Sequence, residues 1–163
     1  MTLTHSLFLI ALLIAASAFF SMAEISLAAS RRLRLRQLAD EGDARAERVL
    51  QMQDQPGEYF TVVQVGLNAV AILGGIVGEG ALSPYLSAML ALWLPQESAQ
   101  TLGFVAPFLA VTSLFILFAD LCPKRLGMAH PEVVAVRVVR PMQGCMVLFK
   151  PIVWLYSRCA DLL

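Results

Sequence analysis

The sequence predicts an all-α integral membrane protein, with three transmembrane helices and further helices lying along the cytoplasmic surface of the membrane. Of its 163 residues, 58% are hydrophobic and 15% are charged, and the mean hydropathy is +0.71. A soluble globular domain averages roughly 45–50% apolar and about 25% charged residues, so this composition indicates a membrane protein. Long uncharged stretches alternate with basic clusters, and this alternation sets the predicted number of spans and their direction.

The first span is expected at about residues 3–29. Residues 1–23 carry no charge, and the basic cluster follows the apolar run instead of preceding it, which favours an anchor over a cleaved signal peptide. Ser17, Ser21 and Glu24 recur on one helical face, so two hydroxyls and a carboxylate line one stripe of an apolar helix. We interpret the stripe as a cation-facing seam. The simpler alternative is that the serines bond their own backbone and that Glu24 lies at the membrane surface.

A basic segment follows at about residues 31–54. Six arginines lie between Arg31 and Arg48 and are interleaved with leucines, and Gly42 is predicted to divide the segment into two short helices. Basic and apolar residues in this pattern are typical of helices that lie on the membrane and touch anionic lipid headgroups.

The second span is expected at about residues 58–80. Thr61, Gln64 and Asn68 lie on roughly one helical face, and asparagine within a membrane needs a hydrogen-bond partner. Asn68 therefore either bonds a neighbouring helix or faces the same cavity as Ser21. Residues 81–95 are uncharged but short for a span, and Pro84 and Pro95 are expected to bracket a short helix there. We expect this helix to be interfacial or re-entrant at the outer face.

The third span is expected at about residues 101–122. No charge occurs from Thr101 to Ala119, and then Asp120 is followed by Pro123 and Lys124. Proline has no N–H for the carbonyl four residues back, so it would break the helix and free the carbonyl of Ala119 beside the Asp120 carboxylate. Such oxygen ligands suit a hard cation. Alternatively, Asp120 is a solvated helix end and Pro123 a stop signal.

The remaining stretch, about residues 131–163, is predicted to lie along the cytoplasmic surface. Pro131, Pro141 and Pro151 recur every ten residues and are expected to divide it into three short helical pieces. All twelve Lys and Arg lie either between residues 31 and 48 or from residue 124 onward. Three spans in the plasma (inner) membrane, with the N-terminus outside and the C-terminus in the cytoplasm, place every positive charge on the cytoplasmic side.

Four stretches together resemble one family: residues 19–27 (FFSMAEISL), the Gly42 hairpin, residues 65–70 (VGLNAV) and residues 120–125 (DLCPKR). They resemble the membrane domain of the CNNM/CorC family of cation exporters, also called haemolysin-related. The resemblance implies a homodimer, with three membrane helices per subunit and a helical belt at the cytoplasmic surface. It also implies a downstream pair of CBS modules that binds ATP, which is absent from this chain.

The resemblance further implies an ion site made by a serine, an asparagine and a carboxylate. Carried onto this sequence, the metal ligands are Ser21, Asn68 and Asp120, with the carbonyl near Gly127 as a weaker candidate. The other polar residues of the two helical stripes complete the expected cation-binding set, namely Ser17, Glu24 and Gln64. Pro123 and Lys124 are expected to form the structural helix break.

Three functions are compatible with these features. The first is export of Mg²⁺ as the substrate, coupled to Na⁺ entry, as the family resemblance implies. The second is export of polyamines such as putrescine and cadaverine, because residues 66–80 and 118–127 most resemble the polyamine-exporting branch. Position 120 is also an aspartate in this chain, whereas many members of the family have glutamate there. A polyamine needs spaced carboxylates such as Glu24 and Asp120 instead of a tight cage.

The third function is that of a membrane anchor or sensor that transports nothing. No nucleophile–base constellation, phosphate loop or Cys/His metal motif occurs in the sequence, so we do not expect an enzyme. The net charge of zero likewise gives no reason to expect a nucleic-acid partner. The expected partners are the lipid bilayer, a second copy of the chain and the exported cation or polyamine.

The predicted direction of the spans can be tested by cysteine labelling of intact cells. An impermeant thiol reagent should label a cysteine placed at Ser98, in the outer loop, and should leave one placed at Asp43 unlabelled. Equal labelling at both positions would contradict the arrangement of three spans with the N-terminus outside.

Overall fold

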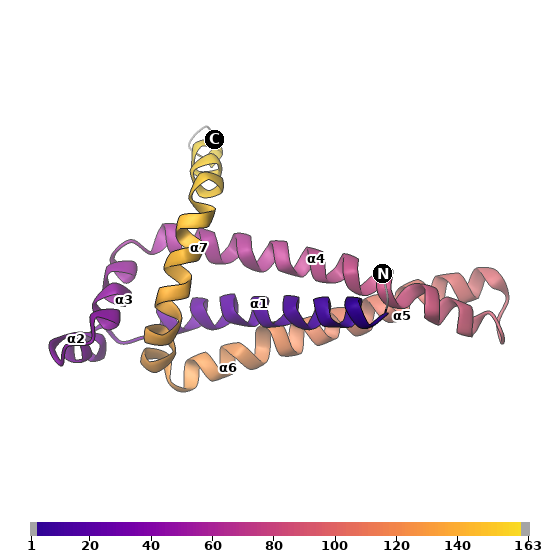
Figure 1. Cartoon of the computed structure of the whole chain (residues 1–163), viewed down its shortest axis with the longest axis horizontal. Coiled ribbons are helices and arrows are strands. Elements are labelled where there is room, and N and C mark those ends of the chain that lie inside the picture. The colour runs from indigo at the N-terminus through magenta and orange to yellow at the C-terminus, as the bar shows by residue number, and fades with distance from the viewer. Residues whose placement is uncertain (1–2, 161–163) are drawn as a thin grey trace. The chain divides into compact units, whose positions relative to one another are not determined.

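The computed structural model describes residues 3–160, and its α-helices are labelled in Figure 1. They are α1 (Leu3–Ala29), α2 (Arg32–Asp40), α3 (Ala44–Asp54), α4 (Pro56–Leu90), α5 (Gln96–Leu114), the π-helix η1 (Phe115–Leu121), α6 (Cys122–Ala129) and α7 (Pro131–Ala160). Residues 3–160 contain no strand, so the all-α prediction is confirmed. The ends of the expected domain, residues 1–2 and 161–163, lie outside the described residues.

Three stretches of helix are long and apolar enough to cross a membrane, as the predicted fold class requires. They are Thr4–Ala29, Pro56–Leu90 and Gln96–Ala129. The second and third are each more than thirty residues long. They therefore extend beyond the expected spans, by about ten residues at the end of α4.

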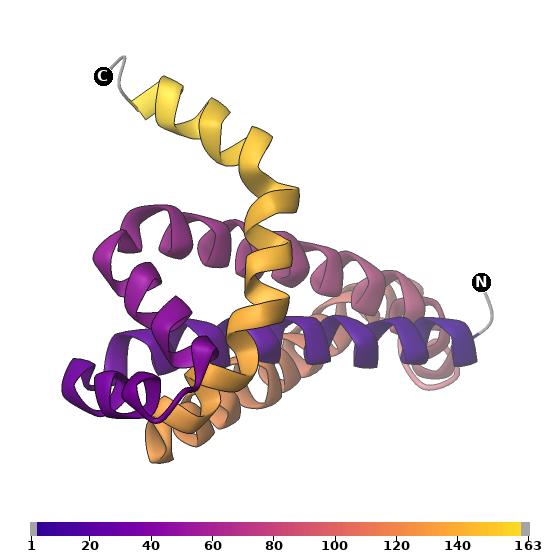
Figure 2. The same ribbon diagram turned by 60° about the vertical axis from the view of Figure 1, so that its left-hand side comes forward.

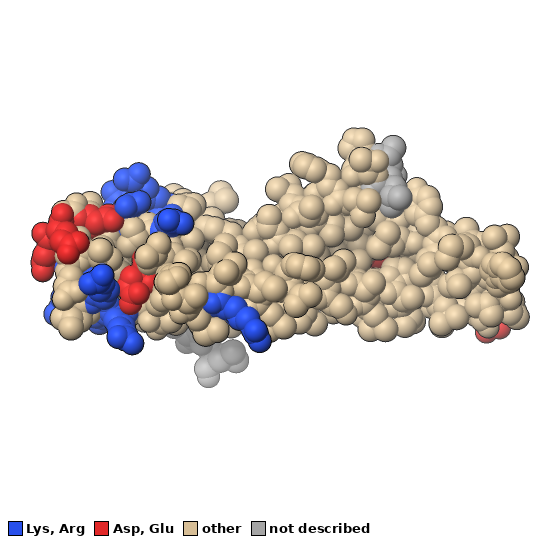
Figure 3. Space-filling view, turned by 90° about the horizontal axis from the view of Figure 1, so that it is seen from below, with Lys and Arg blue, Asp and Glu red and all other residues tan. Residues whose placement is uncertain are grey.

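The described chain divides into two units. The first consists of residues 3–18 and 68–122, and the second of residues 19–67 and 123–160, so that α1 and α4 contribute to both. All twelve Lys and Arg belong to the second unit, whereas the charged residues of the first are Glu79, Glu97 and Asp120. On the face in Figure 3, the basic side chains gather together with most of the acidic ones, and the remaining surface is almost uncharged.

Small residues allow close helix packing in the first unit. A Cβ on Gly78 would overlap the side chain of Val111, and a Cβ on Gly103 would lie 2.7 Å from the Cα of Ser87. Phe115 likewise packs where Gly74 leaves space. Close approach through small residues replaces the hydrophobic driving force that helices lose in lipid, so these glycines hold α4 against α5 and η1.

The second unit contains the predicted pair of short helices. Gly42 adopts a φ of 97°, which favours glycine, and it separates α2 from α3. Asp43 caps α3 by accepting a hydrogen bond from the backbone N–H of Arg45, and the bond from the Arg45 side chain holds the pKa of the Asp43 carboxyl below its usual range. Because Asp43 is a structural cap, the exposed Glu41 is the better position for the cytoplasmic labelling test.

Helix α3 packs against both α2 and α7 (Figure 2). Leu35 of α2, Val49 of α3 and Met142 of α7 are almost wholly buried in the core that these helices share. The expectation that proline divides the last stretch into three pieces was wrong, because α7 continues through Pro141 and Pro151. Val139 and Met142 are buried on either side of Pro141, and this packing offsets the loss of one backbone hydrogen bond.

Residues 81–95 also differ from the expectation. They form no separate short helix, because α4 runs through Pro84 to Leu90 and the chain then turns before α5. The close contact between Ser87 and Gly103 holds α4 against α5 beyond the proline. The helix ends at Leu90, and Pro95 directly precedes α5.

The packing of α4 against α5 predicts different effects for two glycine substitutions. Gly103→Ala should destabilise the protein by about 1–3 kcal/mol, because its Cβ would meet the backbone of Ser87. Gly75→Ala is the control, since its Cβ would meet nothing within 4 Å, and helix propensity should make it neutral or up to about 1 kcal/mol stabilising. Unfolding in mild detergent measures both, and equal stability of the two variants would contradict the close approach.

Candidate functional site

Buried hydroxyls run along α1, as the sequence predicted. The buried polar side chains of the described chain are all serines: Ser6, Ser17, Ser21, Ser26 and Ser30. Ser26 donates to the carbonyl of Ala23 at 3.3 Å, and Ser30 donates to the carbonyl of Ser26 at 2.5 Å. The simpler interpretation therefore holds for Ser26 and Ser30. Ser21 is 0% exposed, and its place on a cation-facing seam stays a prediction.

Glu24 is part of an ion pair. Its Oε2 lies 3.2 Å from the Nζ of Lys124, which stands on α6, and the two side chains are 29% and 32% exposed respectively. Lys124 was predicted only as part of the helix break with Pro123. In the structure it also contacts one of the predicted site residues.

Gly127 lies where α6 packs closely against α1. It is buried, a Cβ there would overlap the side chain of Ile25, and the carbonyl oxygen of Met22 is 3.5 Å from that position. Glycine at this position thus keeps the backbone of α6 beside the stretch of α1 that carries Ser21 and Glu24.

Asp120 lies in the π-helical segment η1, in the first unit. The N–H of Cys122 bonds the carbonyl of Leu117, five residues back, and the chain then continues as α6 through the buried Pro123. The expected helix break at Pro123 was therefore wrong. A π-helical turn widens the helix just before the proline, and such turns are frequent at functional sites.

The remaining predicted residues divide between the two units. Gln64 belongs to the second unit and Asn68 to the first; both side chains are exposed, one turn apart on α4. The proposed ligands Asn68 and Asp120 lie in the first unit together with Ser17, and Ser21 lies in the second. The structure brings together Glu24 with Lys124, and Gly127 with α1, whereas the grouping of Ser21, Asn68 and Asp120 stays a prediction.

Tyr59 supports the seam and was not predicted. Its buried hydroxyl donates a hydrogen bond of 2.8 Å to the carbonyl of Ala23, directly before Glu24. Tyrosine at the start of a span is typical of the membrane interface, and that signal could have drawn attention to it. Its bond to a residue thirty-six positions away could not be inferred from the spacing.

Gln53 holds the C-terminal end of α1 and was also not predicted. Its Nε2 donates to the carbonyls of Leu27 and Ser30, both at 3.0 Å. The carbonyl of Leu27 would ordinarily bond the N–H of Arg31, but that N–H donates to the carboxylate of Glu132 at 3.1 Å. Gln53 thus supplies the donor that the end of the helix lacks.

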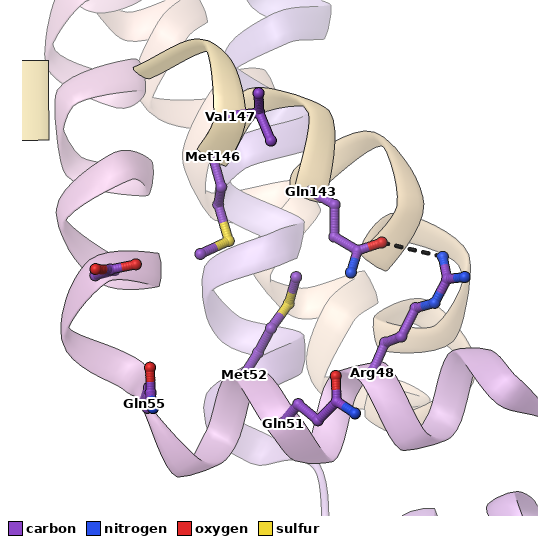
Figure 4. Close-up of a pocket in the computed structure, with 8 residues that line it drawn as sticks. Arg48, Gln51, Met52, Gln55, Gln143, Met146 and Val147 are labelled. Atoms are coloured by element: carbon purple, nitrogen blue, oxygen red, sulfur yellow. Dashed lines mark hydrogen bonds between the residues drawn. The ribbon is translucent and has the colours of Figure 1, made fainter. Parts of the chain in front are cut away.

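The second unit also contains a hollow of about 290 Å³ between α3, α4 and α7 (Figure 4). Met52 and Met146 face its interior, and Arg48 donates a hydrogen bond of 3.1 Å to Gln143 at one side. None of the predicted site residues lines this hollow.

No group of three or more His, Cys, Asp or Glu side chains that could hold a metal ion occurs within residues 3–160. The metal ligands implied by the resemblance, Ser21, Asn68 and Asp120, include a single carboxylate and stay a prediction.

Three apolar helices, and a second unit that holds every basic residue, define a multi-pass, all-α membrane protein. The chain belongs to the CNNM family, because the family model described as the cyclin M transmembrane N-terminal domain matches residues 8–163. This match confirms the resemblance drawn from the four sequence stretches.

Similar curated proteins carry a common name. The chain is 56% identical over 157 residues to the "Polyamine export protein" of Salmonella typhimurium, covering 96% of this chain and 35% of that protein. It is 52% identical to the protein of the same name from Escherichia coli strain K12, covering 98% and 36%, and 48% identical to that of Haemophilus influenzae, covering 99% and 37%. The chain thus spans little more than a third of the length of these relatives.

The two hydrogen bonds from Gln53 to the end of α1 predict a specific loss of stability. Gln53→Leu should destabilise the protein by about 1–3 kcal/mol, because two carbonyls lose their donor. The matched control is Gln51→Leu on the same helix, where the side chain is exposed and the expected change is within about 0.5 kcal/mol. Thermal unfolding in detergent measures both, and a neutral Gln53→Leu would show that this end of the helix needs no such donor.

Proposed function

We propose that this chain forms the membrane domain of a polyamine exporter in the inner membrane. The observation that carries the proposal is the similarity to three proteins named polyamine export protein, at 48–56% identity over 96–99% of the chain. The Mg²⁺ hypothesis has only the wider family resemblance in its favour, so polyamine export is the better supported of the two.

The chemistry of the predicted residues fits a polyamine. A polyamine is a flexible chain that carries an ammonium group at each end, and each ammonium requires an anionic or carbonyl oxygen when it leaves water. Glu24 and Asp120 supply two separate carboxylates, and the α1 hydroxyls supply further acceptors along the seam. Mg²⁺ instead demands short contacts in a near-octahedral cage, a requirement that a flexible diamine does not share.

Asp120 is the central residue of the proposal. It is the charged residue of an otherwise uncharged stretch that begins at Thr101, and it lies in the π-helical segment η1. An ionised side chain within a membrane is costly unless it faces a cavity or a partner. We propose that an ammonium group of the cargo binds this carboxylate during transport.

We further propose that the exporter works as a homodimer, with the N-terminus outside and the C-terminus in the cytoplasm. Gln64 and Asn68 expose two amide side chains on an apolar helix, and amides within a membrane commonly bond a neighbouring helix. A second copy of the chain would supply that neighbour, and the basic second unit would then face the cytoplasm.

Substitution of Asp120 tests the proposal. Asp120→Asn should lower putrescine efflux by at least about tenfold, because a neutral amide cannot offset the cost of dehydrating a cation. Asp120→Glu should retain part of the activity, since it keeps the charge. Glu97→Gln is the matched control, because it removes an exposed carboxylate from the first turn of α5 in the same unit, and it should transport normally.

The measurement is efflux of labelled putrescine from loaded vesicles that contain the full-length protein at matched expression. Normal efflux by Asp120→Asn would contradict the role of this carboxylate. Efflux of Mg²⁺ without efflux of putrescine from vesicles with the unsubstituted protein would favour the Mg²⁺ hypothesis, and transport of neither would favour the membrane anchor.

A further inference from the structure

One ion pair joins two of the long apolar helical stretches. Glu24 lies near the end of α1, Lys124 lies in the first turn of α6, and their charged atoms are 3.2 Å apart. Two further ion pairs, Arg32 with Asp54 and Arg45 with Asp43, belong to the α2–α3 hairpin. The Glu24–Lys124 pair lies on helices expected to cross the membrane.

The backbone that carries Glu24 is held in place by neighbouring helices. The helix backbone on both sides of Glu24 is held, since Tyr59 bonds the carbonyl of Ala23 and Gln53 bonds that of Leu27. Gly127 also allows α6 to pack directly on Met22 and Ile25. Lys124 reaches Glu24 through a four-carbon stem with several rotatable bonds, and its side chain is 32% exposed, so a change of partner at Glu24 requires no movement of either helix.

We propose that Lys124 is a tethered competitor for the cationic cargo at Glu24. This inference rests on the proposed polyamine export. The side chain of lysine ends in a primary alkylammonium on a four-carbon stem, and putrescine presents the same group on a four-carbon chain. When a cargo ammonium binds Glu24, it replaces the Lys124 ammonium, and the carboxylate keeps one cationic partner throughout.

This competition would set the affinity of the site. A ligand that must first displace an internal group binds with an apparent affinity lowered by the fraction of the protein in which the site is open. A transport site must bind well enough to load its cargo and weakly enough to release it. The return of Lys124 to Glu24 would therefore expel the cargo ammonium without leaving a bare carboxylate.

A purely structural role for the ion pair and a role in competition predict opposite changes in cation affinity when the pair is broken. If the pair only ties α6 to α1, loss of Lys124 should loosen the site and weaken or leave unchanged the binding of cations. If Lys124 competes with the cargo, its loss should strengthen binding. The two roles are therefore separated by the direction of the change in affinity.

The first experiment measures putrescine binding to the purified full-length protein by isothermal titration calorimetry. Lys124→Met removes the charge and keeps most of the stem, and it should lower the dissociation constant by about three- to tenfold. Arg125→Met is the matched control, because it removes the neighbouring exposed cation, and it should bind like the unsubstituted protein. Lys124→Arg, which retains a cation, should not bind more tightly.

The outcomes separate this inference from the proposed function. If the unsubstituted protein binds putrescine and Lys124→Met binds it equally or more weakly, the competitor role is wrong and polyamine export stands. An equal gain in putrescine affinity in Arg125→Met would also overturn the competitor role, since the loss of any nearby positive charge would then explain the effect. If neither the unsubstituted protein nor any variant binds putrescine, the proposed function fails.

A second experiment needs no substitution and so does not depend on the folding of a variant. A carbodiimide that joins carboxylates to amines in direct contact should link Glu24 to Lys124, and mass spectrometry of the peptides should detect the link. Putrescine is itself a primary amine, so bound putrescine should replace this link by becoming joined to Glu24, at a concentration where an exposed carboxylate such as Glu97 stays unmodified. Equal modification of Glu24 and Glu97 would overturn the exchange, because it would reflect only the reactivity of free putrescine. A link that forms equally with and without putrescine would contradict the exchange.

Discussion

Hydrogen bonding of the backbone in an apolar surrounding is the constraint on which the rest of this structure depends. Within a bilayer no water is available for a freed N–H or C=O, so a spanning segment remains helical wherever it can. In this chain α4 continues through Pro84, and the third stretch passes from α5 into α6 through a π-helical segment before Pro123. The helices are preserved, and each proline is accommodated by packing or by a local change of helical type.

This constraint explains where the sequence analysis succeeded and where it failed. Three uncharged runs predicted three long apolar helices, because length and composition decide whether a helix can cross a membrane. Gly42 correctly predicted the separation of α2 from α3, since its positive φ is a strictly local property. Proline was misread at Pro84, Pro123 and Pro141, because its effect on a helix depends on the helices packed around it, and these cannot be known from a single sequence.

The distinction between local properties and those that depend on helix packing also applies to the candidate site. Helical spacing placed Ser17, Ser21 and Glu24 on one stripe, and Ser17 and Ser21 are buried, whereas their role in a cation site stays a prediction. The partner of Glu24 could not be predicted, because Lys124 is one hundred residues away in sequence and reaches it only through the packing of α6 on α1. The supporting bonds from Tyr59 and Gln53 are likewise consequences of how the helices pack.

The ion pair also bears on how a site for an organic cation differs from one for a metal ion. A Mg²⁺ cage gains its selectivity from a rigid set of oxygens at fixed distances, and a mobile lysine beside it would add only repulsion. An alkylammonium has softer geometric demands and the same chemistry as the lysine that it would replace. Lys124 beside Glu24 would therefore suit the proposed polyamine better than Mg²⁺, because exchange of one ammonium for another would keep the charge of the site constant.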